Sequence, residues 1–179
     1  MDIDYKEVIG KADSIMKKMV LSLLVDNTAG VLSRVSGMFS RRGYNIDSLS
    51  VGVTENPKYS RMTVVVSGDD LILEQIEKQL NKLEDVVEIE ELKDDFSVCR
   101  ELALIKVKAN REEKQQIIAV ADVFRANIVD VSKGSLIIEI TGNRNKVEAL
   151  IDLLEGFEIT DLVRTGLTGL SRGSADKTR

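Results

Sequence analysis

The sequence predicts an α+β protein made of two consecutive units, each with the element order βαββαβ. Two observations support this prediction. Stretches in which apolar residues alternate are interleaved with stretches in which they recur at helical spacing, and the order of these stretches repeats once along the 179 residues. Each unit is expected to form a four-stranded antiparallel sheet with two helices on one face, the ferredoxin-like arrangement.

The first unit is predicted over residues 18–94. Its strands are expected at about 19–25, 45–54, 60–68 and 86–93, and its helices at about 30–42 and 71–83. The first helix ends in Arg41-Arg42-Gly43, basic residues followed by a glycine, which is a common stop signal. Pro57 marks the turn between the second and third strands. Asp69 or Asp70 is expected to cap the second helix.

The second unit is predicted over residues 95–170, after a break at Asp94-Asp95. Its strands are expected at about 102–109, 127–131, 135–142 and 157–166, and its helices at about 111–126 and from a cap at Asn143 to about 154. Individual residues match between the units. Asn45-Ile46 corresponds to Asn127-Ile128, and Gly68 corresponds to Gly142. Two copies of one unit are the simplest account of these matches.

Two terminal segments lie outside the predicted units. Apolar residues recur at helical spacing over 8–19, so residues 1–17 are interpreted either as an amphipathic leader helix or as a frayed extension. Residues 171–179 are polar and are expected to be disordered.

Within the first unit, the strands around 48–51 and 62–66 leave apolar side chains on both faces of the sheet. A homodimer is therefore expected, formed either edge to edge or face to face through this unit.

The composition restricts the classes of partner. The net charge is −5 with both signs interspersed, so no nucleic-acid partner is expected. No apolar stretch is long enough to span a membrane, and the N-terminus lacks the apolar region of a secretory signal. Cys99 is the single cysteine, which excludes an internal disulfide and a multi-cysteine zinc site. These features predict a cytoplasmic protein.

The sequence contains no histidine, so it has neither a Ser-His or Cys-His pair nor an imidazole metal ligand. Cys99 is interpreted as a half-buried small residue rather than a nucleophile. Asp69-Asp70 is interpreted as a helix cap rather than a metal site. Carboxylates and lysines could still perform chemistry, but no motif in the sequence presents them for catalysis.

Gly30 stands at the start of the first predicted helix, although glycine is a poor helix former. Helix N-termini attract anions, and a residue without a Cβ lets a small carboxylate approach the backbone. Asn27, in a predicted capping position, offers an amide oxygen to an ammonium group, and Val31 with Leu32 offers an apolar wall. These features predict a pocket for a free aliphatic amino acid. A tight β–α turn would also explain the glycine.

The corresponding loop of the second unit serves as an internal comparison. Residues 108–113 contain no glycine, and the helix begins with Glu112-Glu113. These carboxylates complement the helix dipole and would repel an anionic ligand. Only the first unit is therefore expected to bind the amino acid.

Residues 18–93 resemble an ACT domain, the amino-acid-sensing version of this fold. The runs DNTAGVLSRVSGMFSRRGYNIDSLSV, SRMTVVVSGD and LEQIEKQLNKL make the chain similar to the regulatory (small) subunits of acetolactate synthase, also called acetohydroxyacid synthase. The second half agrees in FRANIVDVS, IEITGNRNKVEAL and RTGLTGLSRG. The resemblance covers about residues 18–173.

This resemblance implies a non-catalytic partner of a catalytic (large) subunit that uses thiamine diphosphate, magnesium and FAD in branched-chain amino acid biosynthesis. It also implies feedback inhibition by valine, bound where two ACT domains meet, with leucine or isoleucine as open alternatives. Carried onto this sequence, the effector-binding residues are Asn27, Gly30, Val31 and Leu32 of one copy with Asn45 and Ile46 of the other. Thr28-Ala29 differs from the loop of many relatives, but neither side chain blocks the pocket.

Three other functions occur on folds with this element order. An RNA-binding module with the same element order needs aromatic residues on its central strands, and 60–68 and 135–142 contain none. A small hydrolase of the acylphosphatase kind needs an arginine-rich anion loop, whereas Arg34, Arg41 and Arg42 follow the loop on helical positions and fit a solvated helix. A free-standing ACT-domain sensor of another enzyme shares every pocket residue and stays an alternative.

Overall fold

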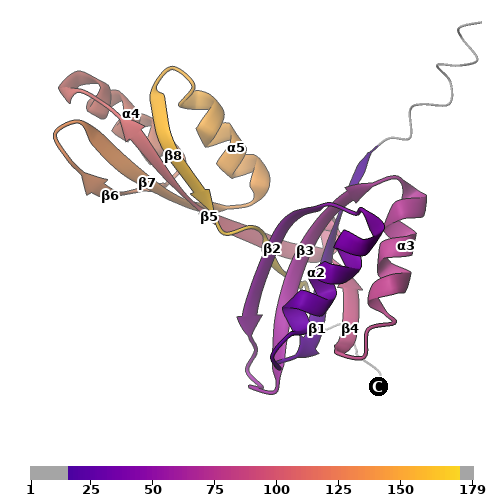
Figure 1. The fold of residues 1–179 in the computed structure, drawn as a ribbon. Coiled ribbons are helices and arrows are strands. Elements are labelled where there is room, and N and C mark those ends of the chain that lie inside the picture. Colours follow the sequence, from indigo (N-terminus) through magenta and orange to yellow (C-terminus); the bar gives the residue numbers. More distant parts are fainter. Residues whose placement is uncertain (1–15, 174–179) are drawn as a thin grey trace, which may run out of the picture. The chain divides into compact units, whose positions relative to one another are not determined.

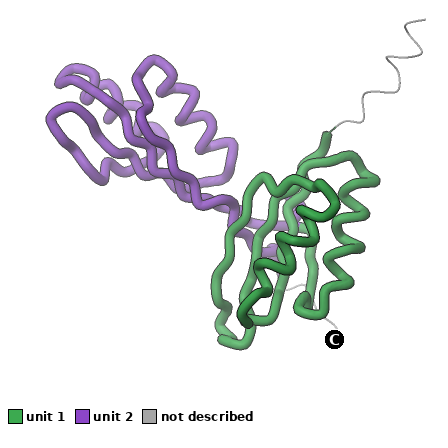
Figure 2. Tube along the Cα trace, in the orientation of Figure 1, with its two compact units in different colours: residues 1–91 green, residues 92–179 purple. Residues whose placement is uncertain are grey.

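The computed structural model describes residues 16–173 (Figure 1). The chain divides into two compact units, residues 1–91 and 92–179 (Figure 2). Each unit contains one sheet with two α-helices in the order βαββαβ, so the predicted α+β class and its repeat are confirmed. No helix within 16–173 has the length and apolar character needed to cross a membrane.

The first unit is an antiparallel sheet with the strand order β2-β3-β1-β4. Its elements are β1 (Lys17–Asp26), α2 (Val31–Arg42), β2 (Ile46–Val53), β3 (Tyr59–Gly68), α3 (Asp70–Leu80) and β4 (Val86–Glu91). Both helices pack on one face of this sheet (Figure 1). The edges are formed by β2 and β4, each of which pairs with one neighbour only.

The core of the first unit lies between the sheet and its helices. Alternate residues of the central strands face it, because successive side chains of a strand point to opposite faces. Residues at helical spacing on α2 and α3 complete it. The buried members are Leu21, Leu23, Val25, Val31, Val35, Met38, Phe39, Met62, Val64, Val66, Leu73, Ile76 and Leu80. This packing fixes the rotation of α2 and directs its first turn to the end of β1.

The second unit has the strand order β6-β7-β5-β8. Its elements are a 3₁₀ turn η1 (Asp94–Phe96), β5 (Ser97–Lys108), α4 (Arg111–Val123), β6 (Asn127–Val131), β7 (Ser135–Gly142), α5 (Arg144–Leu153), β8 (Glu158–Arg164) and β9 (Thr168–Ser171). The last strand pairs only with the first four residues of β5. The remainder of β5 is the central strand between β7 and β8.

The two units share irregularities as well as element order. A bulge follows Ile46 in β2, and a bulge follows the corresponding Ile128 in β6. The glycines that end β3 and β7 are also alike. A Cβ atom would lie 2.7 Å from a side-chain atom of α3 at Gly68, and 2.6 Å from one of α5 at Gly142. Both glycines therefore allow a helix to follow its strand closely, which supports the residue matches between the repeats.

The N-terminal end of the first unit differs from the prediction. The first strand begins at Lys17, so the last residues of the helix expected over 8–19 are extended. The rest of that expected leader, up to residue 15, lies outside the described residues. Strand pairing with β3 begins at Lys17 and overrides the helical spacing of the apolar residues there.

The second unit contains two elements that the sequence analysis did not predict, η1 and β9, and its first strand begins at Ser97 rather than about 102. The four residues of β9, TGLS, contain a single large apolar residue, so they carry no periodic signal. This strand also includes Ser171, the first residue of the tail expected to be disordered. Residues 174–179 of that tail lie outside the described part of the chain.

Candidate functional site at the start of helix α2

Gly30 is the N-cap residue of α2. Its φ of +88° lies in the left-handed region that strongly favours glycine. A Cβ atom at this residue would lie 2.9 Å from Nη1 of Arg34, so the guanidinium fills the space that a side chain would take. The turn therefore favours glycine for its backbone conformation, and the tip of Arg34 would have to shift to admit a Cβ atom. An anion that reaches the backbone here would also meet a guanidinium.

Asn27 does not cap α2, so this part of the sequence prediction is wrong. Its Nδ2 donates to the carbonyl oxygen of Pro57 at 3.0 Å, and its Oδ1 accepts from Ser60 Oγ at 3.0 Å. Its backbone N–H donates to the carbonyl oxygen of Lys58 at 2.7 Å. Asn27 therefore ties the β1–α2 loop to the β2–β3 hairpin. Its amide oxygen retains one lone pair for a further donor.

The start of α2 differs from the starts of the other α-helices within 16–173. Side-chain oxygens of Asp69, Asn110 and Asn143 accept hydrogen bonds from the first turns of α3, α4 and α5. No side chain caps α2 in this way, and its first turn contains no acidic residue. The partial positive charge of this helix end is therefore not offset by a residue of its own turn.

The corresponding helix start in the second unit is satisfied from within. Asn110 Oδ1 accepts from the N–H groups of Glu112 at 2.9 Å and Glu113 at 3.0 Å. In return, Glu113 Oε2 accepts from the backbone N–H of Asn110 at 2.7 Å, which completes a capping box. The contrast supports the interpretation that only the first unit offers a free helix start.

The two residues expected to form an apolar wall point in different directions. Val31 is 2% exposed and belongs to the core, on the same helix face as Val35 and Met38. Leu32 is 46% exposed, because it is the next residue around the helix. An apolar wall at the surface therefore comes from Leu32, while Val31 contributes its backbone.

Asn45 and Ile46 lie at the other end of α2. The helix has 12 residues, so its ends are about 18 Å apart at 1.5 Å per residue. Gly43, with φ +68°, is its C-cap, and Asn45 and Ile46 follow that cap. Asn45 is exposed and its Nδ2 donates to Asp47 Oδ1 at 3.0 Å, while Ile46 is half-buried against the core. Within one chain these two residues do not meet Gly30.

The structure adds an ion pair that the sequence analysis did not find. Arg34 Nε donates to Asp85 Oδ2 at 2.5 Å, and Nη2 donates to Oδ1 at 2.7 Å. The sequence predicts a solvated arginine at this position, but its partner lies 51 residues away, in the turn between α3 and β4. The mutual hydrogen bonds raise the pKa of Arg34 and lower the pKa of Asp85. The backbone oxygen of Asp85 accepts from the N–H of Asp26 at 2.9 Å, so the pair also joins the end of β1.

The other residues weighed for chemistry have structural roles. Asp69 caps α3, with Oδ1 accepting from the N–H of Ile72 at 2.8 Å, as predicted. Asp70 pairs with Lys17 at 2.8 Å. Cys99 is half-buried. Over residues 16–173 no group of three or more His, Cys, Asp or Glu side chains is arranged to hold a metal ion.

Comparison with known proteins shows two consecutive family matches. The AHAS small subunit-like ACT domain matches residues 21–88, and the small subunit of acetolactate synthase matches residues 100–173. The acetolactate synthase small subunit of Mycobacterium bovis is 54% identical over 157 residues, which are 88% of this chain and 94% of that protein. This chain belongs to the acetolactate synthase small-subunit family.

Other relatives of this small-subunit family agree over nearly their whole length. The probable acetolactate synthase small subunit of Archaeoglobus fulgidus is 50% identical, over 88% of this chain and 98% of that protein. The crystal structure of the acetolactate synthase small subunit from Thermotoga maritima is similar with a TM-score of 0.80 and 44% identity, over 88% of this chain and 98% of that one. The matches confirm the family resemblance seen in the sequence, and they include the second unit as well as the ACT domain.

Proposed function

We propose that this chain activates the catalytic subunit of acetolactate synthase and makes it sensitive to feedback inhibition by valine. Membership of the small-subunit family supports the partnership with a catalytic subunit. The observation that carries the effector part is the start of α2, where an uncapped helix N-terminus meets Gly30 and an exposed Leu32. In this proposal thiamine diphosphate, magnesium and FAD belong to the catalytic partner.

The groups at this helix start match the parts of a free aliphatic amino acid. The first-turn N–H groups receive its carboxylate, because they carry the positive end of the helix dipole. The remaining lone pair on Asn27 Oδ1 accepts from its ammonium group. The exposed side chain of Leu32 packs against its aliphatic side chain. A small branched side chain such as that of valine suits this short wall, and leucine or isoleucine are tested beside it.

A second copy of the chain completes the site in this proposal. Asn45 and Ile46 lie at the far end of α2 in their own chain, so they can reach Gly30 only from another copy. An open sheet edge supports such a dimer, because among the described residues β2 pairs with β3 alone. Val51 and Val53 on this edge strand are 48% and 63% exposed. Pairing of two ACT domains through this edge would cover them.

Inhibition requires that valine bind two arrangements of the dimer with different affinities. The arrangement that activates the catalytic subunit is favoured without valine, and the arrangement with lower activity is favoured with it. A coupling free energy of about 1–3 kcal/mol between effector and catalytic partner is ordinary for such a system.

Isothermal titration calorimetry of the purified full chain with valine, leucine and isoleucine tests the effector site. Leu32→Asp places a carboxylate in the first turn of α2, where it suits the helix dipole but repels a ligand carboxylate. Leu153→Asp, at a residue of α5 that is 57% exposed, is the matched control. We expect saturable valine binding in the wild type and in Leu153→Asp but not in Leu32→Asp. No binding of any of the three amino acids to the folded wild type would refute the site.

A further inference from the structure

The guanidinium of Arg34 has one nitrogen that is not used in its ion pair. Nε and Nη2 are both bound to the carboxylate of Asp85. Nη1 donates no hydrogen bond to another residue within 16–173. This atom is the one that lies 2.9 Å from the position of a Cβ at Gly30. Two N–H donors of Arg34 are therefore available beside the uncapped start of α2.

The ion pair with Asp85 orients these donors. A guanidinium is planar, and Asp85 holds it through two parallel hydrogen bonds along one edge, so the hydrogens on Nη1 point away from that carboxylate. Asp85 is held in turn by the hydrogen bond from Asp26 to its backbone oxygen. The side chain of Arg34 is nevertheless 49% exposed. The ion pair thus restricts the guanidinium while leaving it open to solvent, which lowers the entropic cost of a further hydrogen bond.

The electrostatics restrict what Arg34 can recognise. Its charge is largely balanced by Asp85, so it does not act as an isolated cation at long range. A hydrogen bond from a charged donor to a carboxylate is still stronger than one between neutral groups. Nη1 therefore favours an anionic acceptor that approaches closely, at the end of α2 where the helix dipole favours the same charge.

We propose that Arg34 is a further effector-binding residue, which donates through Nη1 to the carboxylate of the bound amino acid, and that Asp85 is its positioning residue. This inference rests on the proposed function and adds a side chain to the carboxylate end of the site. It gives the absence of a Cβ at Gly30 a second consequence, because the guanidinium of Arg34 occupies part of that space.

Calorimetric titration of the full chain with valine tests the assignment in three variants. Arg34→Gln removes the donor, Asp85→Asn breaks the ion pair but keeps the arginine, and Arg42→Gln is the matched control. Arg42 lies in the last turn of the same helix, and its Nη2 donates to Gln79 Oε1 at 2.7 Å. Loss of a hydrogen bond to a charged group predicts valine binding weakened by about tenfold or more in Arg34→Gln. Asp85→Asn should weaken binding by less than Arg34→Gln does, because the Nη1 donors of Arg34 remain, and Arg42→Gln should leave the affinity unchanged.

The comparison between Arg34→Gln and Asp85→Asn separates a direct contact from a structural one. If the ion pair only holds the loop together, breaking it from either side weakens binding equally, and the assignment is overturned. It is also overturned if Arg34→Gln binds valine like the wild type. If Arg34→Gln does not fold, Arg34→Lys takes its place, and binding no weaker than in Asp85→Asn overturns the assignment. A wild type that binds no valine refutes the proposed function itself.

Discussion

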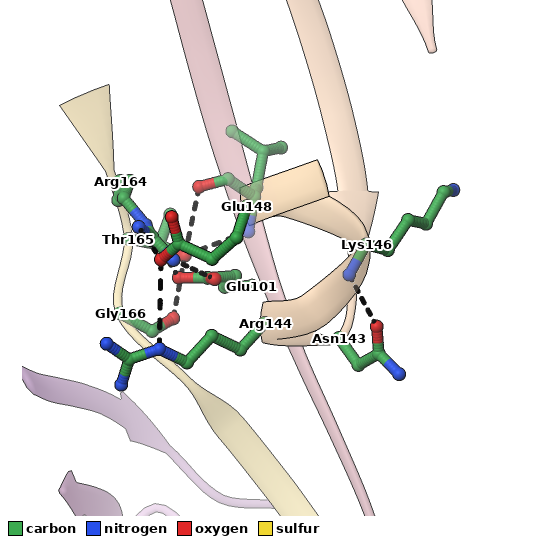
Figure 3. A network of polar contacts seen from close by, with 9 residues as sticks. Glu101, Asn143, Arg144, Lys146, Glu148, Arg164, Thr165 and Gly166 are labelled. Atoms are coloured by element: carbon green, nitrogen blue, oxygen red, sulfur yellow. Dashed lines mark hydrogen bonds and ion pairs between the residues drawn. The ribbon is translucent and has the colours of Figure 1, made fainter. Parts of the chain in front are cut away.

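Arg164 on β8 holds the carboxylate of Glu101 on β5 with two hydrogen bonds (Figure 3). Nε donates to Oε2 at 3.1 Å and Nη2 donates to Oε1, while Nη1 donates to Glu148 Oε1 on α5 at 2.7 Å. The side chain of Glu101 is 4% exposed, and these hydrogen bonds raise the pKa of Arg164. One arginine thus joins two strands and a helix of the second unit.

Arg164→Met is expected to destabilise the second unit by about 3–5 kcal/mol, because it leaves the buried carboxylate of Glu101 without its partner. The double variant Arg164→Met with Glu101→Met should recover much of this loss, since no unpaired buried charge remains. Urea unfolding of the full chain measures both free energies. A single variant within about 1 kcal/mol of the wild type would contradict a tightly coupled pair.

The Arg34–Asp85 pair predicts a pH-dependent contribution to stability. The pKa of Asp85 is lowered below its ordinary value of 3.8, so the contribution is fully present above that pH. It is lost as the pH falls through the lowered pKa, because the protonated carboxyl group no longer balances Arg34. The difference in melting temperature between the wild type and Asp85→Asn should therefore be present at pH 7 and decrease below about pH 3.8. An equal difference at pH 7 and pH 2 would contradict this.

Substitution by alanine should change the free energy of unfolding in opposite directions at Gly30 and at Gly37. Gly30→Ala places a Cβ at φ +88° and against Arg34, so it should cost about 1–2 kcal/mol. Gly37 lies inside α2, and a new Cβ there would meet nothing within 4 Å beyond the backbone of its own helix, so Gly37→Ala should stabilise by about 0.5–1 kcal/mol. Urea unfolding of the two variants checks the signs. Stabilisation by Gly30→Ala would mean that the loop adopts another conformation.

The repeat and its helix ends were predictable because their signals are local. Asp69 and Asn143 stand where a cap is needed, and Gly43 follows basic residues at the end of α2. The structure confirms all three positions. Asn27 looks like a cap by the same local rule, yet the N-cap is Gly30, three residues later. Its side chain bonds to the hairpin at Pro57 and Ser60, which are distant in sequence.

The ion pairs were not predicted from the sequence because their partners, like those of Asn27, are distant in sequence. Arg34 and Asp85 are 51 residues apart, and Glu101 and Arg164 are 63 apart. Such contacts follow from strand order and loop geometry, which no local periodicity encodes. The pocket residues at 27–32 could be proposed from spacing because they share one turn. The helix predicted over 30–42 already separates Asn45 and Ile46 from that turn within one chain, and α2 has this length in the structure.

The most direct test measures acetolactate formation by the catalytic subunit with this chain and with its Leu32→Asp variant, each with and without valine. The account predicts that both chains raise the rate of the catalytic subunit. Valine should then lower the rate only in the presence of the wild-type chain. If the wild-type chain raises the rate and valine leaves it unchanged, the chain is an activator without the sensor proposed at the start of α2.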